Sequence, residues 1–251
     1  MSDLDEIKKL LDKEVLKRDR IDEITLDKPD PILVAKRYKE EFSSLICSLF
    51  AYGNAHQIVK FLNSLDFSLL EKDEDTIKRE LSNRYYRFQK PKDVTALFIA
   101  LKRIKEKSSL KDIFLKGYKK NGEVLEGIKE LIESIYQIYP YSSQGYTFLI
   151  GKIPSKNPSS PYKRWNMFLR WMVREDNIDF GLWKEVKRSD LIIPLDTHTF
   201  NISRKLNLLD RKTYDFKAAK LLTQTLKKFD PKDPVKYDFA LYRIGQEGIL
   251  K

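Results

Sequence analysis

Cysteine and histidine are almost absent from this chain of 251 residues, which has one Cys and two His. One cysteine excludes an internal disulfide and any site for zinc or iron–sulfur built from cysteines alone. Two histidines are too few for a His-rich metal site. We therefore expect no metal and no cofactor, and we expect Cys47, which lies in an apolar segment, to be a small buried residue.

Long apolar runs are also missing, since none approaches the 18 residues that a membrane helix needs. The segment Met1–Glu6 is acidic and lacks the apolar core of a signal peptide. We expect no membrane association and a cytoplasmic location. Acidic side chains are in the minority, with 37 Asp and Glu against 48 Lys and Arg and a formal net charge of +11. This excess favours a polyanionic partner, although a lysine-rich soluble protein without such a partner has the same charge.

Alternating strand patterns are scarce, whereas apolar residues recur with helical period along nearly the whole chain. In the first segment, Ile7, Leu11 and Leu16 are predicted to share one helix face. Further helices are predicted over 32–38, 42–50, 55–65, 94–104, 110–118, 124–138, 164–174, 199–206, 216–228 and 235–249. The prediction is an all-α fold, with at most a short strand near Leu191–Ile193.

The segment Pro194–Phe200, Pro-Leu-Asp-Thr-His-Thr-Phe, carries the strongest functional signal. It follows the apolar Leu191–Ile193 and places Asp196 at the N-cap of a predicted helix. Backbone N–H groups hold a carboxylate in place there and keep it ionised. Such a carboxylate can stabilise positive charge that develops on a bound sugar.

Lys163 lies at the start of another apolar helix, after the Pro- and Ser-rich segment 153–161. A helix N-terminus disfavours an ammonium group, and the apolar neighbours Trp165 and Phe168 add desolvation, so the amine is expected to be available as a nucleophile. An amine that attacks C1′ of a sugar forms a Schiff base and permits strand cleavage by β-elimination. The alternative is that Lys163 is one of many surface lysines.

The segment Ile193–Phe200 resembles the aspartate segment of the helix–hairpin–helix (HhH-GPD) DNA glycosylase superfamily. There, a Pro-Val-Asp-x-His or Val-Asp-Thr-His run carries the catalytic aspartate, and the catalytic lysine lies upstream on the second helix of the hairpin. The long interval between Lys163 and Asp196 resembles that of archaeal-type 8-oxoguanine glycosylases. The chain from about residue 30 to residue 250 also resembles a bacterial, uncharacterised (DUF2400-like) branch. The blocks that carry this second resemblance are Ala51–Asn54, Tyr86–Phe88, Lys163–Arg174 and Asp233–Leu241.

The resemblance implies one all-α domain over residues 1–251, with two helical sub-lobes and a DNA cleft between them. It implies a monomeric base-excision repair enzyme that binds double-stranded DNA containing a damaged base. The implied activity is removal of 8-oxoguanine, followed by strand cleavage as an AP lyase. Lys163 would be the nucleophile, and Asp196 would stabilise the sugar cation and assist proton transfers.

The chain departs from the superfamily in the hairpin itself. The usual Gly-x-Gly, whose amides hold a DNA phosphate, is replaced by Pro158–Tyr162, Pro-Ser-Ser-Pro-Tyr. The amides of Ser159, Ser160 and Tyr162 are expected to hold the phosphate instead. The replacement leaves Lys152 and Lys156 as alternatives to Lys163. The residues expected to contact DNA are Ser159, Ser160, Tyr162, Arg164, Lys156 and His198. His198 is also expected to support the turn that carries Asp196.

A flipped base needs an aromatic face and a few polar groups. Asp238 and Tyr242 lie one turn apart on the last predicted helix, and the archaeal-type enzymes use such a pair. Asp238 is expected to accept hydrogen bonds from guanine N–H groups, with Tyr242 or Phe239 stacking on the base. The alternative is that Tyr242 fills the core and Asp238 is an exposed charge.

The turn Tyr52-Gly53-Asn54 is the one that faces the lesion in this superfamily. Tyr52 is expected to fill the gap that the flipped base leaves, and Gln57 to read a base edge. Asn54 is expected to contact the substrate or, alternatively, to cap the helix that follows.

Three other functions fit the same sequence. The chain could be a glycosylase for another damaged base, such as an alkylated base or an oxidised pyrimidine. It could be a DNA-binding module that has the fold without the chemistry, which predicts salt-sensitive duplex binding without base release. An RNA-binding protein is the third alternative.

Overall fold

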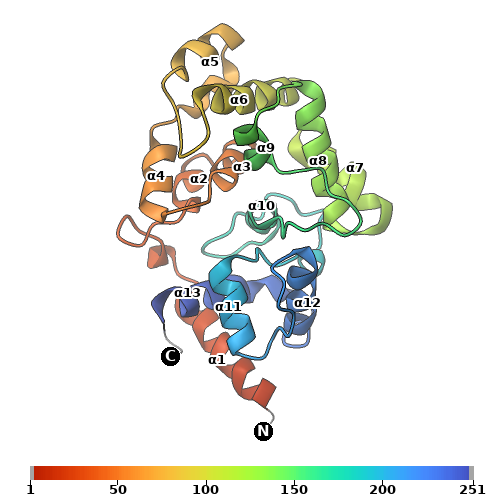
Figure 1. Ribbon diagram of the computed structural model, residues 1–251. Coiled ribbons are helices and arrows are strands. Elements are labelled where there is room, and N and C mark those ends of the chain that lie inside the picture. Colours follow the sequence, from red (N-terminus) through yellow and green to blue (C-terminus); the bar gives the residue numbers. More distant parts are fainter. Residues whose placement is uncertain (1–2, 249–251) are drawn as a thin grey trace. The chain divides into compact units, whose positions relative to one another are not determined.

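The computed structural model describes residues 3–248, which form 13 α-helices, four short 3-10 helices and no β-strand (Figure 1). The α-helices are α1 (Asp3–Arg18), α2 (Ile32–Tyr38), α3 (Glu41–Leu49), α4 (Ala55–Asn63), α5 (Glu74–Glu80), α6 (Pro91–Lys105), α7 (Leu110–Asn121), α8 (Val124–Ile138), α9 (Gln144–Ile150), α10 (Lys163–Val173), α11 (Thr197–Lys205), α12 (Phe216–Lys227) and α13 (Asp238–Glu247). The 3-10 helices are η1 (Ile21–Glu23), η2 (Phe67–Glu71), η3 (Arg188–Asp190) and η4 (Pro234–Tyr237). The prediction of an all-α fold is confirmed for this part of the chain.

The chain divides into two compact units. The terminal unit comprises Met1–Ile24 and Ser155–Lys251, of which residues 3–24 and 155–248 are described, and the inserted unit comprises Thr25–Pro154. The terminal unit contains α1 and α10–α13, and the inserted unit contains α2–α9. The predicted catalytic residues Lys163 and Asp196 therefore belong to the same unit.

In the inserted unit, α7 and α8 pack against each other along their lengths (Figure 1). Two glycines permit this close approach. A Cβ at Gly117 would lie 2.2 Å from the backbone oxygen of Glu126, and a Cβ at Gly127 would lie 2.4 Å from the ring of Phe114. Helix α6 supplies much of the core of this unit, with Phe98 completely buried. Apolar burial of this kind is the main stabilising term for the unit.

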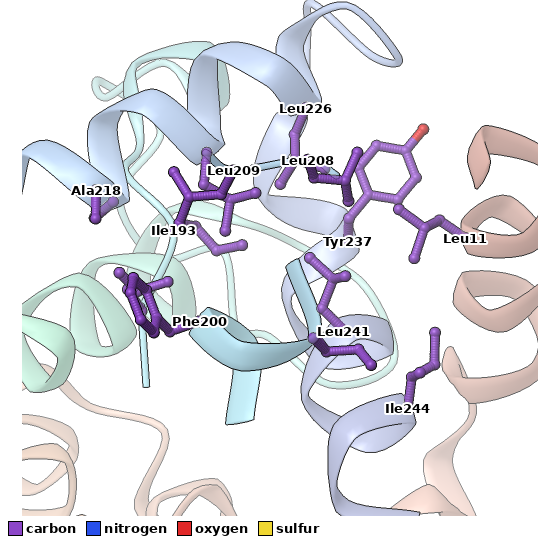
Figure 2. Close-up of a cluster of buried hydrophobic side chains, with 14 of the residues drawn as sticks. Leu11, Ile193, Phe200, Leu208, Leu209, Ala218, Leu226, Tyr237, Leu241 and Ile244 are labelled. Atoms are coloured by element: carbon purple, nitrogen blue, oxygen red, sulfur yellow. The ribbon is translucent and has the colours of Figure 1, made fainter. Parts of the chain in front are cut away.

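In the terminal unit, α11 packs on α13, and α1 packs on α13 as well (Figure 1). Their shared apolar core includes Leu11, Phe200 and Leu241, together with side chains of α12 (Figure 2). The buried Arg18 of α1 also forms an ion pair with Glu247 at the end of α13, at 2.8 Å. These contacts fix the starts of α11 and α13, which carry Asp196 and Asp238.

Three details differ from the sequence predictions. Leu191–Ile193 is extended but forms no strand, because the Ile193 amide donates to Thr223 Oγ1 at 3.0 Å and no neighbouring strand is present in the described residues. Leu16 is 78% exposed, so it does not share the buried face of Ile7 and Leu11. The helix predicted over 235–249 is divided into η4 and α13, which ends at Glu247, and residue 249 lies outside the described residues.

Candidate functional site

Helix α10 begins at Lys163, as predicted. The residue before it, Tyr162, has a φ of 50°, in the left-handed region that non-glycine residues rarely adopt. Three contacts hold this turn: the Tyr162 amide donates to Ser160 Oγ at 3.2 Å, Asn166 Nδ2 donates to the Pro161 carbonyl at 3.0 Å, and the Tyr162 ring meets Phe216 edge-on at 6.3 Å. The backbone that carries the lysine is therefore firmly positioned.

Asp196 is the N-cap of α11, which confirms the prediction. Its Oδ1 accepts a hydrogen bond from the Thr199 amide at 2.7 Å. The residue before it is also fixed, because Leu195 is buried and its carbonyl accepts a hydrogen bond from the Tyr214 hydroxyl at 2.7 Å. One carboxylate oxygen of Asp196 is thus engaged in the cap. The side chain is only half-buried, so the carboxylate keeps access to solvent.

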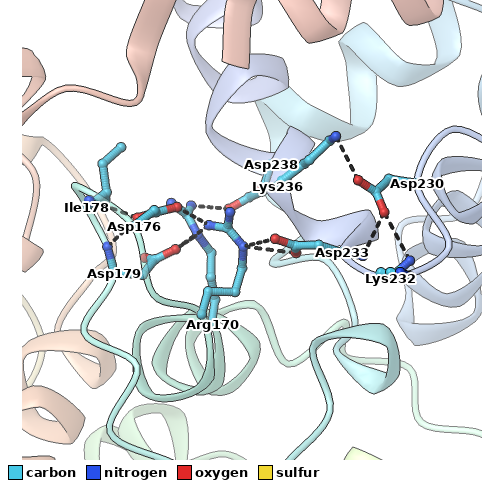
Figure 3. Close-up of polar contacts among 10 residues, drawn as sticks. Arg170, Asp176, Ile178, Asp179, Asp230, Lys232, Asp233, Lys236 and Asp238 are labelled. Atoms are coloured by element: carbon cyan, nitrogen blue, oxygen red, sulfur yellow. Dashed lines mark hydrogen bonds and ion pairs between the residues drawn. The ribbon is translucent and has the colours of Figure 1, made fainter. Parts of the chain in front are cut away.

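Asp238, at the start of α13, is buried rather than exposed. Its Oδ2 accepts a hydrogen bond from Arg170 Nη1 at 2.7 Å, and Arg170 Nε donates to Asp179 at 3.0 Å (Figure 3). Arg174, the C-cap residue of α10, pairs with Asp179, with Asp176 at 2.7 Å and with Asp233 at 3.0 Å. Two buried arginines and four aspartates thus form one network around the end of α10.

The electrostatic environment of Asp238 connects it with both predicted catalytic residues. Burial raises the pKa of Asp238 to about 6, the Arg170 guanidinium opposes this rise, the negative charge of Asp196 adds to it, and the positive charge of Lys163 opposes it. Lys163, Asp196 and Asp238 all belong to the terminal unit. The charges of Lys163 and Asp196 thus converge on the buried carboxyl of Asp238, although the three residues are far apart in the sequence and both effects are smaller than those of burial and Arg170.

The other residues predicted on the last helix lie beside this group. The Tyr242 ring is 6.0 Å from the ring of His198 and 6.2 Å from that of Phe239. Phe239 is buried, and the Arg170 guanidinium lies over its ring at 5.7 Å. Tyr242 is only half-buried, so part of its ring surface is open to solvent. The packing of α11 on α13 thus gathers Asp238, Phe239, Tyr242 and His198.

Tyr52, Asn54 and Gln57 belong to the inserted unit. Asn54 is the N-cap of α4, accepting hydrogen bonds from the amides of His56 at 3.0 Å and Gln57 at 3.3 Å, which is the capping alternative. The Gln57 side chain is exposed, and the Tyr52 ring joins an aromatic cluster with Phe88 and Phe148.

The residues predicted to hold phosphates differ in accessibility. Lys156, Ser159 and Ser160 are exposed, and Arg164 is half-buried. Tyr162 is buried and its amide already donates to Ser160, so a phosphate would have to replace that hydrogen bond.

The arginine–aspartate network is the part of the site that the sequence reasoning missed. A signal for it exists, because Arg170 and Arg174 lie four residues apart in the apolar stretch Met167–Arg174, and charged groups buried there must find partners. The Asp176–Asp179 segment that follows the helix provides them, and Asp176 Oδ1 accepts hydrogen bonds from two amides of the same turn.

Within residues 3–248, no three His, Cys, Asp or Glu side chains are grouped as a metal site would require. No helix in the same range combines the length and the apolar character of a membrane span. Cys47 is buried in α3, and burial raises the pKa of its thiol well above the usual range.

Residues 30–247 match the model of a family described as "Protein of unknown function (DUF2400)". The chain belongs to this family. The match includes Lys163, Asp196 and the arginine–aspartate network, so the whole site lies within the part of the chain that defines the family. No curated protein and no solved structure is significantly similar to the chain.

Proposed function

We propose that this protein is a base-excision repair enzyme that removes 8-oxoguanine from double-stranded DNA and then cleaves the strand as an AP lyase. The observation that carries the proposal is the placement of Lys163 at the start of α10 and Asp196 at the N-cap of α11 in one unit, with both charges acting on the buried Asp238. An amine and a carboxylate held at two helix starts suit a reaction in which a sugar is attacked and its positive charge is stabilised.

Lys163 acts as the nucleophile in the proposed reaction. Its Nζ attacks C1′ of the nucleotide, the bond between C1′ and the base breaks, and the bonding electrons leave with the base, which takes up a proton. Opening of the sugar ring gives a Schiff base between Nζ and C1′. Removal of a proton from C2′ then expels the phosphate at C3′ and breaks the strand.

Asp196 stabilises the cationic sugar in this scheme. The hydrogen bond to the Thr199 amide fixes one of its oxygens, which leaves the other to face the developing charge. A carboxylate held by an N-cap needs no reorganisation as the charge forms. It can also accept a proton during base loss and elimination.

Asp238 and Tyr242 are assigned to the base. Arg170 engages Oδ2 of Asp238, which leaves Oδ1 for the N–H groups of an 8-oxoguanine. Because its pKa is about 6, Asp238 is mostly ionised at neutral pH and can accept those hydrogen bonds. The half-buried Tyr242, beside Phe239, offers the aromatic face.

The test is borohydride trapping on a DNA duplex that contains one 8-oxoguanine, with a duplex of undamaged guanine as the substrate control. The wild-type protein is expected to form a covalent adduct with the damaged duplex alone. Lys163→Gln should form none, and Asp196→Asn, which retains a capping side chain, should form it far more slowly. Lys217→Gln is the matched lysine control, because Lys217 is an exposed lysine of α12 in the same unit, and it should behave as the wild type does.

The other outcomes separate the alternatives. Release of free base without an adduct would replace the Schiff base by a water-dependent mechanism and refute the role of Lys163. Neither adduct nor released base would refute 8-oxoguanine as the substrate. A panel of alkylated and oxidised bases would then separate a glycosylase of other specificity from a DNA-binding module without catalysis.

A further inference from the structure

Three aromatic rings of the inserted unit form a cluster that the proposed chemistry does not use. The Tyr52 ring lies 5.6 Å from that of Phe88 and 5.0 Å from that of Phe148, and the two phenylalanine rings are 4.5 Å apart. Tyr52 follows α3, Phe88 precedes α6, and Phe148 lies on α9. Tyr52, Phe88 and Phe148 are called the aromatic patch below.

The turns that carry the aromatic patch are held in place. The Tyr86 hydroxyl donates to the Tyr52 carbonyl at 2.7 Å, and the Arg87 guanidinium lies over the Tyr52 ring at 5.9 Å. Both turns contain a residue with positive φ, Gly53 at 99° and Arg87 at 55°. A non-glycine residue in this region stores strain that the surrounding contacts must offset, and such residues concentrate at functional sites.

The aromatic patch is open to solvent. Phe88 is 46% exposed and Phe148 is 42% exposed. Exposing two adjoining phenylalanine rings forgoes the stabilisation that burial of apolar surface would bring. Fixed, exposed and adjoining rings are a surface on which another flat ring can stack.

The charges around the aromatic patch indicate what that ring belongs to. The three segments that carry it, residues 51–60, 82–92 and 144–154, contain no Asp or Glu. Asp93 follows the second segment directly, but it is buried and accepts hydrogen bonds from the Lys90 amide at 2.7 Å and the Tyr141 hydroxyl at 3.0 Å. The same segments contain the basic residues Lys60, Arg84, Arg87, Lys90, Lys92 and Lys152. Exposed aromatic rings among basic residues, with the adjoining carboxylate of Asp93 buried, fit the bases and phosphates of nucleic acid better than they fit an apolar protein surface.

From these observations we infer that the aromatic patch binds an unpaired base of a DNA strand by stacking, while the basic residues around it hold the flanking phosphates. The inference goes beyond the proposed function, because it concerns a surface of the inserted unit and does not depend on Lys163 or on catalysis. A base inside a duplex is stacked on its neighbours on both sides, so only an unpaired base can occupy such a surface.

Fluorescence anisotropy with two labelled probes of equal length tests the inference: single-stranded oligothymidine and a fully paired duplex. The full-length protein is expected to bind the single strand more tightly. Phe88→Leu and Phe148→Leu keep an apolar side chain but remove a ring. Each should weaken single-strand binding roughly 5- to 100-fold and leave duplex binding unchanged.

Two further variants complete the test. Tyr38→Leu is the matched control, because Tyr38 is 44% exposed in the same unit but lies outside the three segments, and it should bind as the wild type does. Arg87→Gln should lower the slope of log affinity against log salt by about 0.7, as loss of one phosphate contact to a single strand predicts.

Equal affinity of the wild-type protein for both probes would overturn the inference, as would undiminished binding by folded Phe88→Leu and Phe148→Leu. Loss of duplex binding in these variants would assign the surface to double-stranded DNA and overturn it as well. Failure of the borohydride experiment would refute the proposed chemistry and leave this result unaffected.

Discussion

The titration of Asp238 is the most direct quantity by which the candidate site can be tested. A rise of its pKa from 3.8 to about 6 corresponds to about 3 kcal/mol of preference for the protonated form. The folded protein holds this proton more tightly than the unfolded chain. The stability that the group contributes is therefore fully present below pH 4 and is lost as the pH rises to about 6.

Two substitutions should move this titration in opposite directions. Asp196→Asn removes a negative charge, so the pKa of Asp238 should fall, and Lys163→Gln removes a positive charge, so that pKa should rise. Both charges affect the carboxyl less than burial and Arg170 do. Each change should therefore be below about 1 pH unit, or on the order of 1 kcal/mol.

The assay is a pH titration of the side-chain carboxyl carbons by NMR, in protein labelled with ¹³C at aspartate. The Asp238 signal is assigned by its loss in Asp238→Asn. Asp215→Asn is the matched control, because Asp215 caps α12 as Asp196 caps α11 but pairs with Arg211, and it should leave the midpoint unchanged. Unchanged midpoints in both site variants, or shifts of the same sign, would refute the convergence of the three residues. A wild-type midpoint near 4 would refute the argument from burial.

Three further predictions concern stability and are measured by urea unfolding at pH 7. Arg170→Met leaves Asp179 and Asp238 without their shared partner and should cost about 3–5 kcal/mol. The exposed Arg20–Asp22 pair provides the control, so Arg20→Met should cause no measurable change. Asp196→Ala should lower the free energy of unfolding by about 0.5–2 kcal/mol through loss of the cap, and Asp196→Asn should be close to the wild type. Equal losses of stability in the two variants would contradict the capping role. Leu241→Ala should cost about 2–5 kcal/mol, because Leu241 of α13 is fully buried in the apolar core that α13 shares with α1, α11 and α12, and a loss below 1 kcal/mol would contradict that packing.

Local signals in the sequence determined most helices of this protein and the positions of two residues of the candidate site. The segments 94–104, 110–118 and 124–138 have strong apolar periodicity and are helical as predicted. Lys163 at the start of α10 followed from the apolar helix that comes after the Pro- and Ser-rich segment 153–161. Asp196 at the N-cap of α11 followed from capping chemistry, which involves only neighbouring residues. The short helices α5 and α9 were missed, and α5 has a single apolar residue, Ile77, so it offers no apolar periodicity to recognise.

Only the tertiary structure decided which residues that are distant in the sequence contact each other. An apolar run such as Leu191–Ile193 suits a strand or a buried connection equally, and the hydrogen bond to Thr223 from α12 settles it as a connection. Asp238 carries the same side chain as an exposed aspartate, but the packing of the terminal unit buries it. This burial raises its pKa, and Arg170, 68 residues away in the sequence, opposes the rise as its hydrogen-bond partner. Charge and burial act through space, so the character of such a carboxyl is fixed by packing between helices and not by its neighbours in the chain.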